Sequence, residues 1–330
     1  MNILFTNFCN KNCPYCFAKG KLILEKRLKR SYISLKNLKI IVNFLKRSKE
    51  KSVRIMGGEP TLHPKFKEAI TMLLRQGMRV TIFSNGIINA DIVGFLQNLD
   101  KNKCSVILNI NAPESYTKKE WSMIKKTMKS LNRSIKLGFN IYRLDFNMDF
   151  IIKLIQDYNL DRSVRLAIAN PLLGQNNEYI PLKEHKKIAP KIIKFAQKCD
   201  SLDITLNFDC GFTLCSFTEE ECGKLFYYNS PLKTFCDPGI DVGPDLTVWR
   251  CFVTSMLWNK RLTDFRNTFE INNFYINKFM PFHRMGATNR CFKCKYLKRG
   301  QCVGGCLGHT LKIFHLENRL SVRRGAEEGS

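Results

Sequence analysis

The chain has 330 residues, of which 44% are hydrophobic and 25% are charged, a composition typical of a globular protein with a buried core. No apolar run is as long as a membrane span and the first residues do not form a signal peptide, so we exclude a membrane protein and expect a cytoplasmic one. The 54 basic residues outnumber the 28 acidic residues for a net charge of +26, which favours anionic partners such as nucleic acid or an acidic peptide.

Apolar runs rich in β-branched residues alternate with stretches of helical spacing over residues 1–200. The predicted strands are Asn2–Asn7, Ser52–Gly57, Arg79–Asn85, Ser105–Asn111, Ile135–Tyr142 and Ser163–Ala169. The predicted helices are Leu35–Lys49, Phe66–Gln76, Ala90–Asn98, Lys118–Leu131, Phe150–Tyr158 and Leu182–Lys198. Because each strand is followed by a helix, right-handed crossovers predict an α/β fold with a parallel sheet in an open or partial barrel.

Three cysteines, Cys9, Cys13 and Cys16, follow directly on the first predicted strand, and Tyr15 precedes the third of them. The chain has 14 cysteines and no secretion signal, which favours metal ligation over disulfide bonds. Three thiolates are one short of a closed tetrahedral site, as in a catalytic metal site or a cluster with one uncapped iron. The alternative is a zinc knuckle that takes a distant fourth ligand.

This spacing, CxxxC and then any residue, an aromatic residue and C, resembles the signature of the radical S-adenosylmethionine (radical SAM) superfamily. The resemblance implies that Cys9, Cys13 and Cys16 hold a 4Fe–4S cluster, that SAM chelates its free iron, and that Tyr15 belongs to the same site. It also implies a partial (β/α)6 TIM-like barrel, which agrees with the predicted elements. In such barrels the chemistry lies at the carboxyl ends of the strands.

The second predicted strand ends in Gly57, Gly58 and Glu59. Glycines allow a ligand to approach the backbone closely, although such a pair is also common in an ordinary turn. The three residues resemble the GGE element of the family, which implies that the glycine backbone and the Glu59 carboxylate contact the amino group of SAM. A carboxylate is a suitable acceptor for that amine.

Polar residues also follow the third and fourth predicted strands. By the resemblance, Ser84 and Asn85 contact the ribose or carboxylate of SAM, although a simple turn explains Asn85 equally well. Asn109 and Asn111 interrupt an apolar strand, and side chains at alternate positions share one face. We expect them to point into the mouth of the barrel and to bind the cofactor.

After residue 200 the alternation ends and the cysteines become dense. They are Cys210, Cys215, Cys222, Cys236, Cys251, Cys291, Cys294, Cys302 and Cys306. The closely spaced groups suit a zinc ribbon, but they also resemble the SPASM extension of radical SAM peptide maturases, which carries auxiliary iron–sulfur clusters. We expect a barrel at 1–200, a SPASM-like domain with one or two auxiliary 4Fe–4S clusters at 201–320, and a disordered or expression-derived tail at 321–330.

The SPASM pattern implies two ligand sets, with a predicted hairpin at Pro238–Arg250. The inner cluster would take Cys236, Cys251, Cys306 and one upstream cysteine, and the outer cluster would take Cys291, Cys294 and Cys302. The chain departs from the pattern, because seven residues separate its CxxC and CxxxC groups and no cysteine follows Cys306. Cys210 or Cys215 could supply the missing ligands. Cys222 fits a free buried thiol or a hydrogen-atom donor to a substrate radical.

The resemblance implies an enzyme that reductively cleaves SAM to a 5′-deoxyadenosyl radical and removes hydrogen from a peptide or protein. Auxiliary clusters favour an oxidative modification or a crosslink in the maturation of a ribosomally made peptide. Flavodoxin or ferredoxin would supply the electron, and a separate protein could bind the leader because Cys9 lies near the first residue. The alternatives are radical SAM chemistry on RNA and a non-enzymatic zinc protein that binds nucleic acid.

Overall fold

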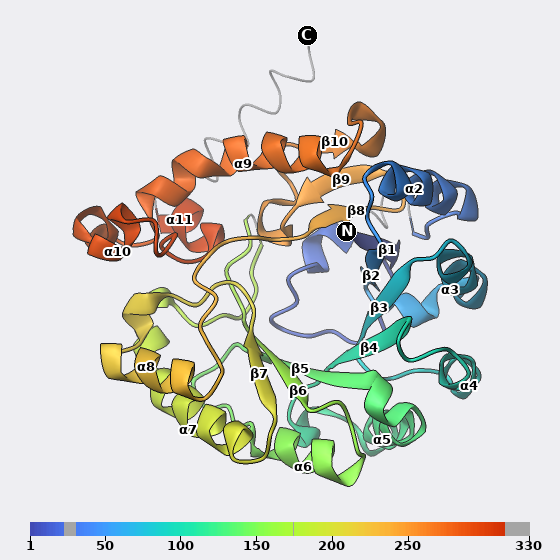
Figure 1. Ribbon diagram of the computed structural model, residues 1–330, viewed down its shortest axis with the longest axis horizontal. Helices are drawn as coiled ribbons and strands as arrows, with labels where there is room; N and C mark the ends of the chain where they lie inside the picture. Colours follow the sequence, from blue (N-terminus) through green and yellow to red (C-terminus); the bar gives the residue numbers. More distant parts are fainter. Residues whose placement is uncertain (23–30, 174, 314–330) are drawn as a thin grey trace.

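The computed structural model describes residues 1–22, 31–173 and 175–313, so the predicted tail at 321–330 lies outside the described residues. Its core is a curved parallel sheet in which β1 to β7 pair in chain order (Figure 1). The strands are β1 Asn2–Thr6, β2 Ser52–Gly57, β3 Arg79–Ser84, β4 Cys104–Asn109, β5 Ile135–Ile141, β6 Ser163–Ile168 and β7 Thr205–Phe208. Six of these strands match the predicted ones to within two residues, which confirms the α/β partial barrel.

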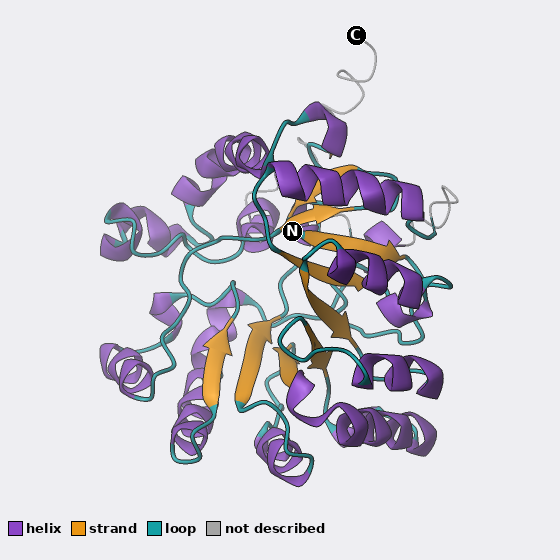
Figure 2. Cartoon of the chain, turned by 45° about the vertical axis from the view of Figure 1, so that its right-hand side comes forward, coloured by secondary structure: helices purple, strands orange, loops and turns teal. Residues whose placement is uncertain are grey.

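The helices lie on the outer face of the sheet, where their apolar faces cover the strands (Figure 2). They are α2 Leu35–Arg47, α3 Phe66–Arg75, α4 Ala90–Gln97, α5 Lys118–Leu131, α6 Asp149–Asp157 and α7 Ala189–Asp200. Helix α5 starts with a capping box in which Thr117 and Glu120 satisfy each other's backbone N–H groups. The last predicted helix is divided into a 3₁₀ turn and α7, because Pro190 suits a helix start and not its interior.

The residues after 200 extend the sheet at both edges, which the sequence did not predict. Strand β7 pairs in parallel with β6. At the opposite edge the predicted hairpin is confirmed as β8 Ile240–Val242 and β9 Thr247–Arg250, and β8 pairs in parallel with β1. Strand β10, Lys260–Arg261, continues this edge. Only Leu206 and Phe208 of β7 are buried, so the apolar signal of this strand is short.

Four more helices complete the described part of the chain: α8 Glu219–Tyr227, α9 Thr268–Met285, α10 Lys295–Lys298 and α11 Leu307–Ile313. Figure 1 shows α9 lying across β8–β10, where the buried Tyr275 hydroxyl donates to the carbonyl of Val248 over 2.7 Å. In the described ranges, no helix combines the length and the apolar character that a membrane span requires.

Two buried histidines lie side by side, His185 in the 3₁₀ turn before α7 and His309 in α11. His185 is 0% exposed, its Nε2 lies 3.0 Å from the carbonyl oxygen of Ile180, and its ring centroid lies 5.7 Å from that of His309. Burial lowers the pKa of His185 from 6.5 to about 4 and the pKa of His309 to about 3. Both rings are therefore neutral at physiological pH.

This pair predicts a loss of stability in mild acid. Between pH 6.5 and about 4 the unfolded chain binds a proton at residue 185 and the folded chain does not, so the free energy of unfolding falls as the pH falls. We expect His185→Gln to reduce the slope of the thermal midpoint against pH in this window, measured under anoxic conditions. Carboxylates titrate equally in both proteins, so identical slopes for the variant and the wild type would contradict the prediction.

Candidate active site and cysteine clusters

The loop after β1 brings the three predicted cysteine ligands together. Burial raises the pKa of the Cys9, Cys13 and Cys16 thiols, and each is raised further by another thiol of the three. Cys9 is exposed and the other two are partly exposed. The three thiols therefore fit a metal cluster that keeps one position accessible from solvent.

The glycine pair at the end of β2 makes room for this loop. A Cβ atom on Gly57 would lie 2.3 Å from the carbonyl oxygen of Thr6. One on Gly58 would lie 2.1 Å from the carbonyl oxygen of Phe8 and 2.9 Å from the Cβ of Cys9. The N–H of Gly58 donates to Thr6 over 2.8 Å. Close packing of the cysteine loop on β2 thus requires both glycines, and their contact with SAM stays a prediction.

Glu59 is 0% exposed and joins the ends of β2 and β3. Its Oε1 accepts from the Thr61 hydroxyl over 2.7 Å and from the Ser84 hydroxyl over 3.0 Å, and its Oε2 accepts from the N–H of Asn85 over 2.8 Å. Burial raises the pKa of the Glu59 carboxyl, and these donors oppose the rise. The sequence predicted an acceptor for the SAM amine here, and the structure adds three donors from within the protein. Contacts of Glu59 and Ser84 with SAM stay predictions.

Asn85 connects the loop after β3 to the cysteine loop. Its Nδ2 donates to Oδ1 of Asn10 over 2.7 Å and lies 3.8 Å from Sγ of Cys9. An N–H group beside sulfur favours the thiolate that a metal requires. Asn85 is therefore placed next to a predicted cluster ligand, a position that neither the SAM-binding nor the turn interpretation had specified.

Tyr15 and Asn111 meet on the other side of the cysteine loop. The Tyr15 hydroxyl donates to Oδ1 of Asn111 over 2.7 Å, and the Tyr15 ring lies 4.5 Å from that of Tyr142. The backbone N–H of Asn111 donates to the Tyr116 hydroxyl over 2.9 Å. Both predicted site residues are buried, and they fix the loop against the end of β4.

Asn109, which the sequence predicted to point into the barrel, belongs to a polar group whose pairing the sequence did not show. Arg165 on β6 forms an ion pair with Asp209, and its Nη1 lies 3.5 Å from Oδ1 of Asn109 on β4. The contact passes over Gly138 on β5, where a Cβ would lie 2.5 Å from the Asn109 oxygen. The predicted contact of Asn109 with the cofactor stays a prediction.

Four other cysteines line one pocket between the two edges of the sheet, and we call them the inner set: Cys210, Cys236, Cys251 and Cys306. Burial raises the pKa of Cys210 to about 12 and that of Cys236 to about 11. Burial raises the pKa of the Cys251 and Cys306 thiols well above the usual value, and other thiols of the inner set raise it further. The sequence left the upstream member open between Cys210 and Cys215, and the structure places Cys210 in this pocket.

The inner set shows signs of a built site. Cys251 has a φ of 80°, which is costly for a residue other than glycine and is often found at functional positions. Its backbone N–H donates to the carboxylate of Asp241, which is 2% exposed. Four thiols around a shared pocket match the donor set of an iron–sulfur cluster.

Within residues 1–22, 31–173 and 175–313, no three His, Cys, Asp or Glu side chains are grouped as ligands of a single metal ion. This finding covers the inner set and Cys9, Cys13 and Cys16 alike, so it does not distinguish zinc from an iron–sulfur cluster. Four thiolates suit either group.

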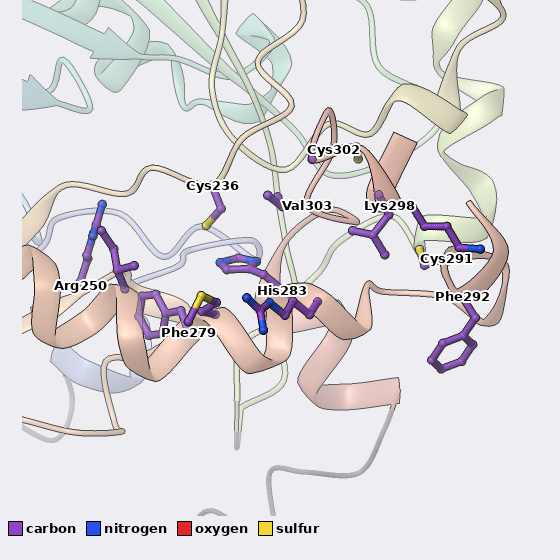
Figure 3. Close-up of a pocket in the computed structure, with 14 residues that line it drawn as sticks. Cys236, Arg250, Phe279, His283, Cys291, Phe292, Lys298, Cys302 and Val303 are labelled. Carbon is purple, nitrogen blue, oxygen red and sulfur yellow. The ribbon is translucent and has the colours of Figure 1, made fainter. Parts of the chain in front are cut away.

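A larger cavity of about 590 Å³ lies between α9 and the segment 291–303. Figure 3 shows Cys236 on one side of it and Cys291 on the other, with His283 of α9 between them. Cys302 also lines this cavity. The cavity therefore separates the inner set from a second group of cysteines near the end of the described chain.

The remaining three cysteines lie away from these groups. Cys104 and Cys199 are buried in the core, and burial raises the pKa of each to about 12. Cys222 lies on α8, which packs beside α7 in the outer helical layer (Figure 1). The predicted role of Cys222 as a hydrogen donor stays a prediction.

Comparison with known proteins identifies the domain. Residues 3–155 match the family described as the radical SAM superfamily. These residues form a radical SAM domain. Radical SAM enzymes use a 4Fe–4S cluster and SAM. The three thiols in the loop after β1 suit such a cluster, and the loop is accessible from solvent at Cys9.

Two curated relatives illustrate the range of the similarity. The "Radical SAM cyclopropyl synthase TigE" of Paramaledivibacter caminithermalis is 24% identical over 99% of this chain and 71% of its own length. The "Probable GTP 3′,8-cyclase" of Methanocaldococcus jannaschii is 26% identical over 63% of this chain and 69% of its own length. The relatives of this chain thus carry the names of different activities, a cyclopropyl synthase and a GTP cyclase.

Solved structures share the fold of this chain. The structure of anSMEcpe with bound AdoMet has a TM-score of 0.62, is 16% identical, and covers 98% of this chain and 97% of its own. Streptococcus suis SuiB bound to S-adenosylmethionine has a TM-score of 0.60, is 16% identical, and covers 92% of this chain and 72% of its own. A further structure shows SuiB bound to precursor peptide SuiA, with a TM-score of 0.54 at 12% identity over 79% of this chain and 61% of its own.

Proposed function

We propose that this radical SAM enzyme oxidatively modifies a peptide or protein, most specifically a ribosomally made precursor peptide. The observation that carries the proposal is the inner set of four buried thiols in one pocket beside the partial barrel. An auxiliary cluster at this position would accept the electron that remains when a substrate radical is oxidised. A reaction that leaves the oxidation state unchanged would not need it.

The extent of the similarities supports a peptide substrate. TigE, anSMEcpe and SuiB align with 92% to 99% of this chain, and so include its cysteine-rich part. The GTP cyclase aligns with 63% of the chain. Among the solved structures with this fold, SuiB is recorded with a precursor peptide.

The residues around the cysteine loop have defined tasks in this mechanism. Cys9, Cys13 and Cys16 would hold the barrel cluster, which with bound SAM supplies a carbon radical that can remove hydrogen from an unreactive C–H bond. Tyr15 and Asn111 fix the loop, and the Asn85 amide lies beside the Cys9 sulfur. An external one-electron donor such as flavodoxin or ferredoxin, and a separate leader-binding protein, complete the proposal.

The inner thiols must lose their protons when they bind iron. Burial raises the pKa of all four thiols, so they are neutral at physiological pH in the metal-free chain. Cluster binding therefore releases protons. Four protein thiolates close such a site, so it would carry electrons without binding the peptide.

Small precursor peptides encoded beside the gene provide the test. The full chain, reconstituted with iron and sulfide without oxygen, is given SAM, dithionite and each peptide. We expect 5′-deoxyadenosine to form and the peptide to lose mass as hydrogen is removed, both measured by mass spectrometry. Cys16→Ala serves as the control and should give neither product. The peptide proposal fails if active enzyme leaves every candidate peptide unchanged.

RNA is the second candidate substrate, favoured by the net charge of +26. If RNA is the substrate, binding should weaken steeply as salt is raised, because bound cations leave the phosphate backbone on binding. A peptide complex held by apolar and backbone contacts should show a shallow dependence. The slope of log affinity against log salt therefore separates the two candidates.

A further inference from the structure

The two faces of the curved sheet differ in character. The outer face, under the helices, is apolar and buried, as at Val106 and Leu108 of β4 (Figure 2). On the inner face, opposite the helices, the side chains of β3, β4 and β7 are partly or fully exposed, and Asn109 is one of them. A closed barrel of eight strands fills this space with packed side chains. The open sheet of this chain therefore leaves its inner face accessible to a bound molecule.

Basic residues predominate on this inner face. Arg79 of β3, Lys136 of β5 and Arg165 of β6 take inner positions, because the residues next to them in each strand are buried under the helices. The described strands β3 to β7 contain no acidic residue, and Asp209 directly after β7 supplies one carboxylate. The excess of positive charge favours an anionic group.

Arg165 lies near the end of the inner face that carries the cysteine loop. It is level with Gly138 of β5, and Gly138 is level with Asn109 of β4. Two residues beyond Asn109, the side chain of Asn111 accepts from the Tyr15 hydroxyl of the cysteine loop. Two residues of a strand span about 7 Å. A group bound to Arg165 therefore lies close to the loop where the proposed radical forms.

Three neighbours hold the guanidinium of Arg165 in one orientation. Asp209 forms an ion pair with Nη2, Oδ1 of Asn109 lies 3.5 Å from Nη1, and Cζ lies 5.6 Å from the centroid of the Phe83 ring. A guanidinium carries five N–H donors. The hydrogen bonds of Arg165 within the described part of the chain use one N–H on each of two nitrogens, so donors remain for a bound group.

Fold stability does not account for this arrangement. The side chains of Arg165 and Asp209 are 24% and 33% exposed, and ion pairs that water reaches contribute little to stability. An oriented arginine that solvent can reach is instead suited to binding, because its planar fork matches the two oxygens of a carboxylate.

We propose that Arg165 is a specificity-determining residue that binds a carboxylate of the peptide substrate, while Asp209 and Asn109 orient its guanidinium. The inference rests on the proposed function and names the chemical group that the substrate places inside the barrel. An acidic side chain and the C-terminus of a peptide present the same two oxygens. Holding the peptide at this group fixes which C–H bond the radical meets.

Three small probes test the assignment on the full chain, reconstituted without oxygen and studied without reductant. N-acetylglutamate methylamide carries only the side-chain carboxylate, N-acetylalanine carries only the α-carboxylate, and N-acetylglutamine methylamide carries neither. Binding is measured as the broadening of the NMR lines of each probe by the protein. We expect at least one carboxylate probe to bind and the glutamine probe not to bind, and the stronger carboxylate probe identifies the source of the group.

Arg165→Gln is expected to weaken binding of the carboxylate probe by about 10–100-fold, the effect of losing hydrogen bonds to a charged group. Arg162→Gln is the matched control, because it removes the same charge from an exposed residue whose Nη1 donates to the carbonyl of Leu202. It should bind the probe as the wild type does. Iron content and the thermal midpoint check the fold of both variants. If Arg165→Gln does not fold, Arg165→Lys replaces it and should also weaken binding, because lysine keeps the charge without the fork.

Any precursor peptide that proves active provides a second measurement. Its acidic residues are replaced one at a time by the corresponding amides, and its C-terminus is amidated in a further peptide. One of these changes should raise KM about 10–100-fold for the wild type and leave KM of Arg165→Gln unaltered, because the two changes remove the same contact.

Three results would overturn the assignment. They are equal binding of the carboxylate probes to Arg165→Gln and the wild type, wild-type binding of these probes no stronger than that of the glutamine probe, and an equal loss of SAM affinity in Arg165→Gln, which would assign the arginine to SAM. The probes need no active peptide. Carboxylate binding through Arg165 without any modified peptide would count against the peptide proposal alone, whereas a modified peptide with unchanged probe binding in Arg165→Gln would count against this assignment alone.

Discussion

Gly58→Ala is expected to remove about four irons from the reconstituted protein and to abolish SAM cleavage. The added Cβ would lie 2.1 Å from the carbonyl oxygen of Phe8, a backbone atom that cannot rotate away, and 2.9 Å from the Cβ of Cys9. The cysteine loop must move to relieve the clash, and its three thiols then no longer meet. Overpacking of this kind also costs about 1–3 kcal/mol of stability.

Gly94→Ala provides the matched control for this variant. Gly94 lies within α4, and a Cβ there would meet no atom within 4 Å. Alanine favours a helix over glycine by about 1 kcal/mol, so this variant should keep its iron and gain slightly in stability. Equal iron contents in Gly58→Ala and Gly94→Ala would show that the glycine pair does not position the cysteine loop.

Cys13→Ala is expected to lower the rate of 5′-deoxyadenosine formation by more than about 100-fold, since even changes outside the ligand shell cost about 10–100-fold. It should lose about four irons and keep eight or fewer, those of the auxiliary sites, at about four per cluster. Cys13 is the middle member of the loop, and its thiol lies near that of Cys16. The measurements are iron content and chromatography of the nucleoside product.

Cys104→Ala is the control for this second experiment, because Cys104 is a core cysteine outside every proposed ligand set. It should keep full iron content and lose only stability. If Cys13→Ala forms the nucleoside at the wild-type rate, the barrel cluster is not required for SAM cleavage.

The barrel and its cysteine loop could be predicted because their signals are local. Buried parallel strands contain continuous apolar runs, as in Ile3–Phe5 of β1, and the predicted metal ligands lie within eight residues, from Cys9 to Cys16. The hairpin β8–β9 was also predicted, since a strand pattern on either side of a turn needs no knowledge of distant residues.

Pairings between distant segments could not be predicted. Nothing local to Ile240–Val242 indicates that it pairs with β1, more than 200 residues earlier. The same holds for Cys210 and Cys215, whose different surroundings depend on how β7 and the end of the chain pack. The pairing of Arg165 with Asp209 depends on the register of β6 against β7.

Glu59 shows how the position of a motif can be predicted while its contacts within the protein are not. The residue lies at the end of β2 as predicted, and its oxygens accept from Thr61, Ser84 and Asn85. A buried carboxylate has to find donors, and here they are the hydroxyl and amide groups of the adjoining loops. A sequence pattern does not show which of these groups will contact the carboxylate.

The inner cysteines come from the two opposite edges of the curved sheet, which does not close into a full barrel. Cys210 follows β7 at one margin, and Cys236 and Cys251 flank the hairpin at the other. No backbone ladder joins β7 to that hairpin in the described sheet. In the proposed holoenzyme, an iron–sulfur cluster would therefore crosslink the two edges of the open sheet. Oxidative loss of this cluster would destabilise the fold as well as interrupt electron transfer.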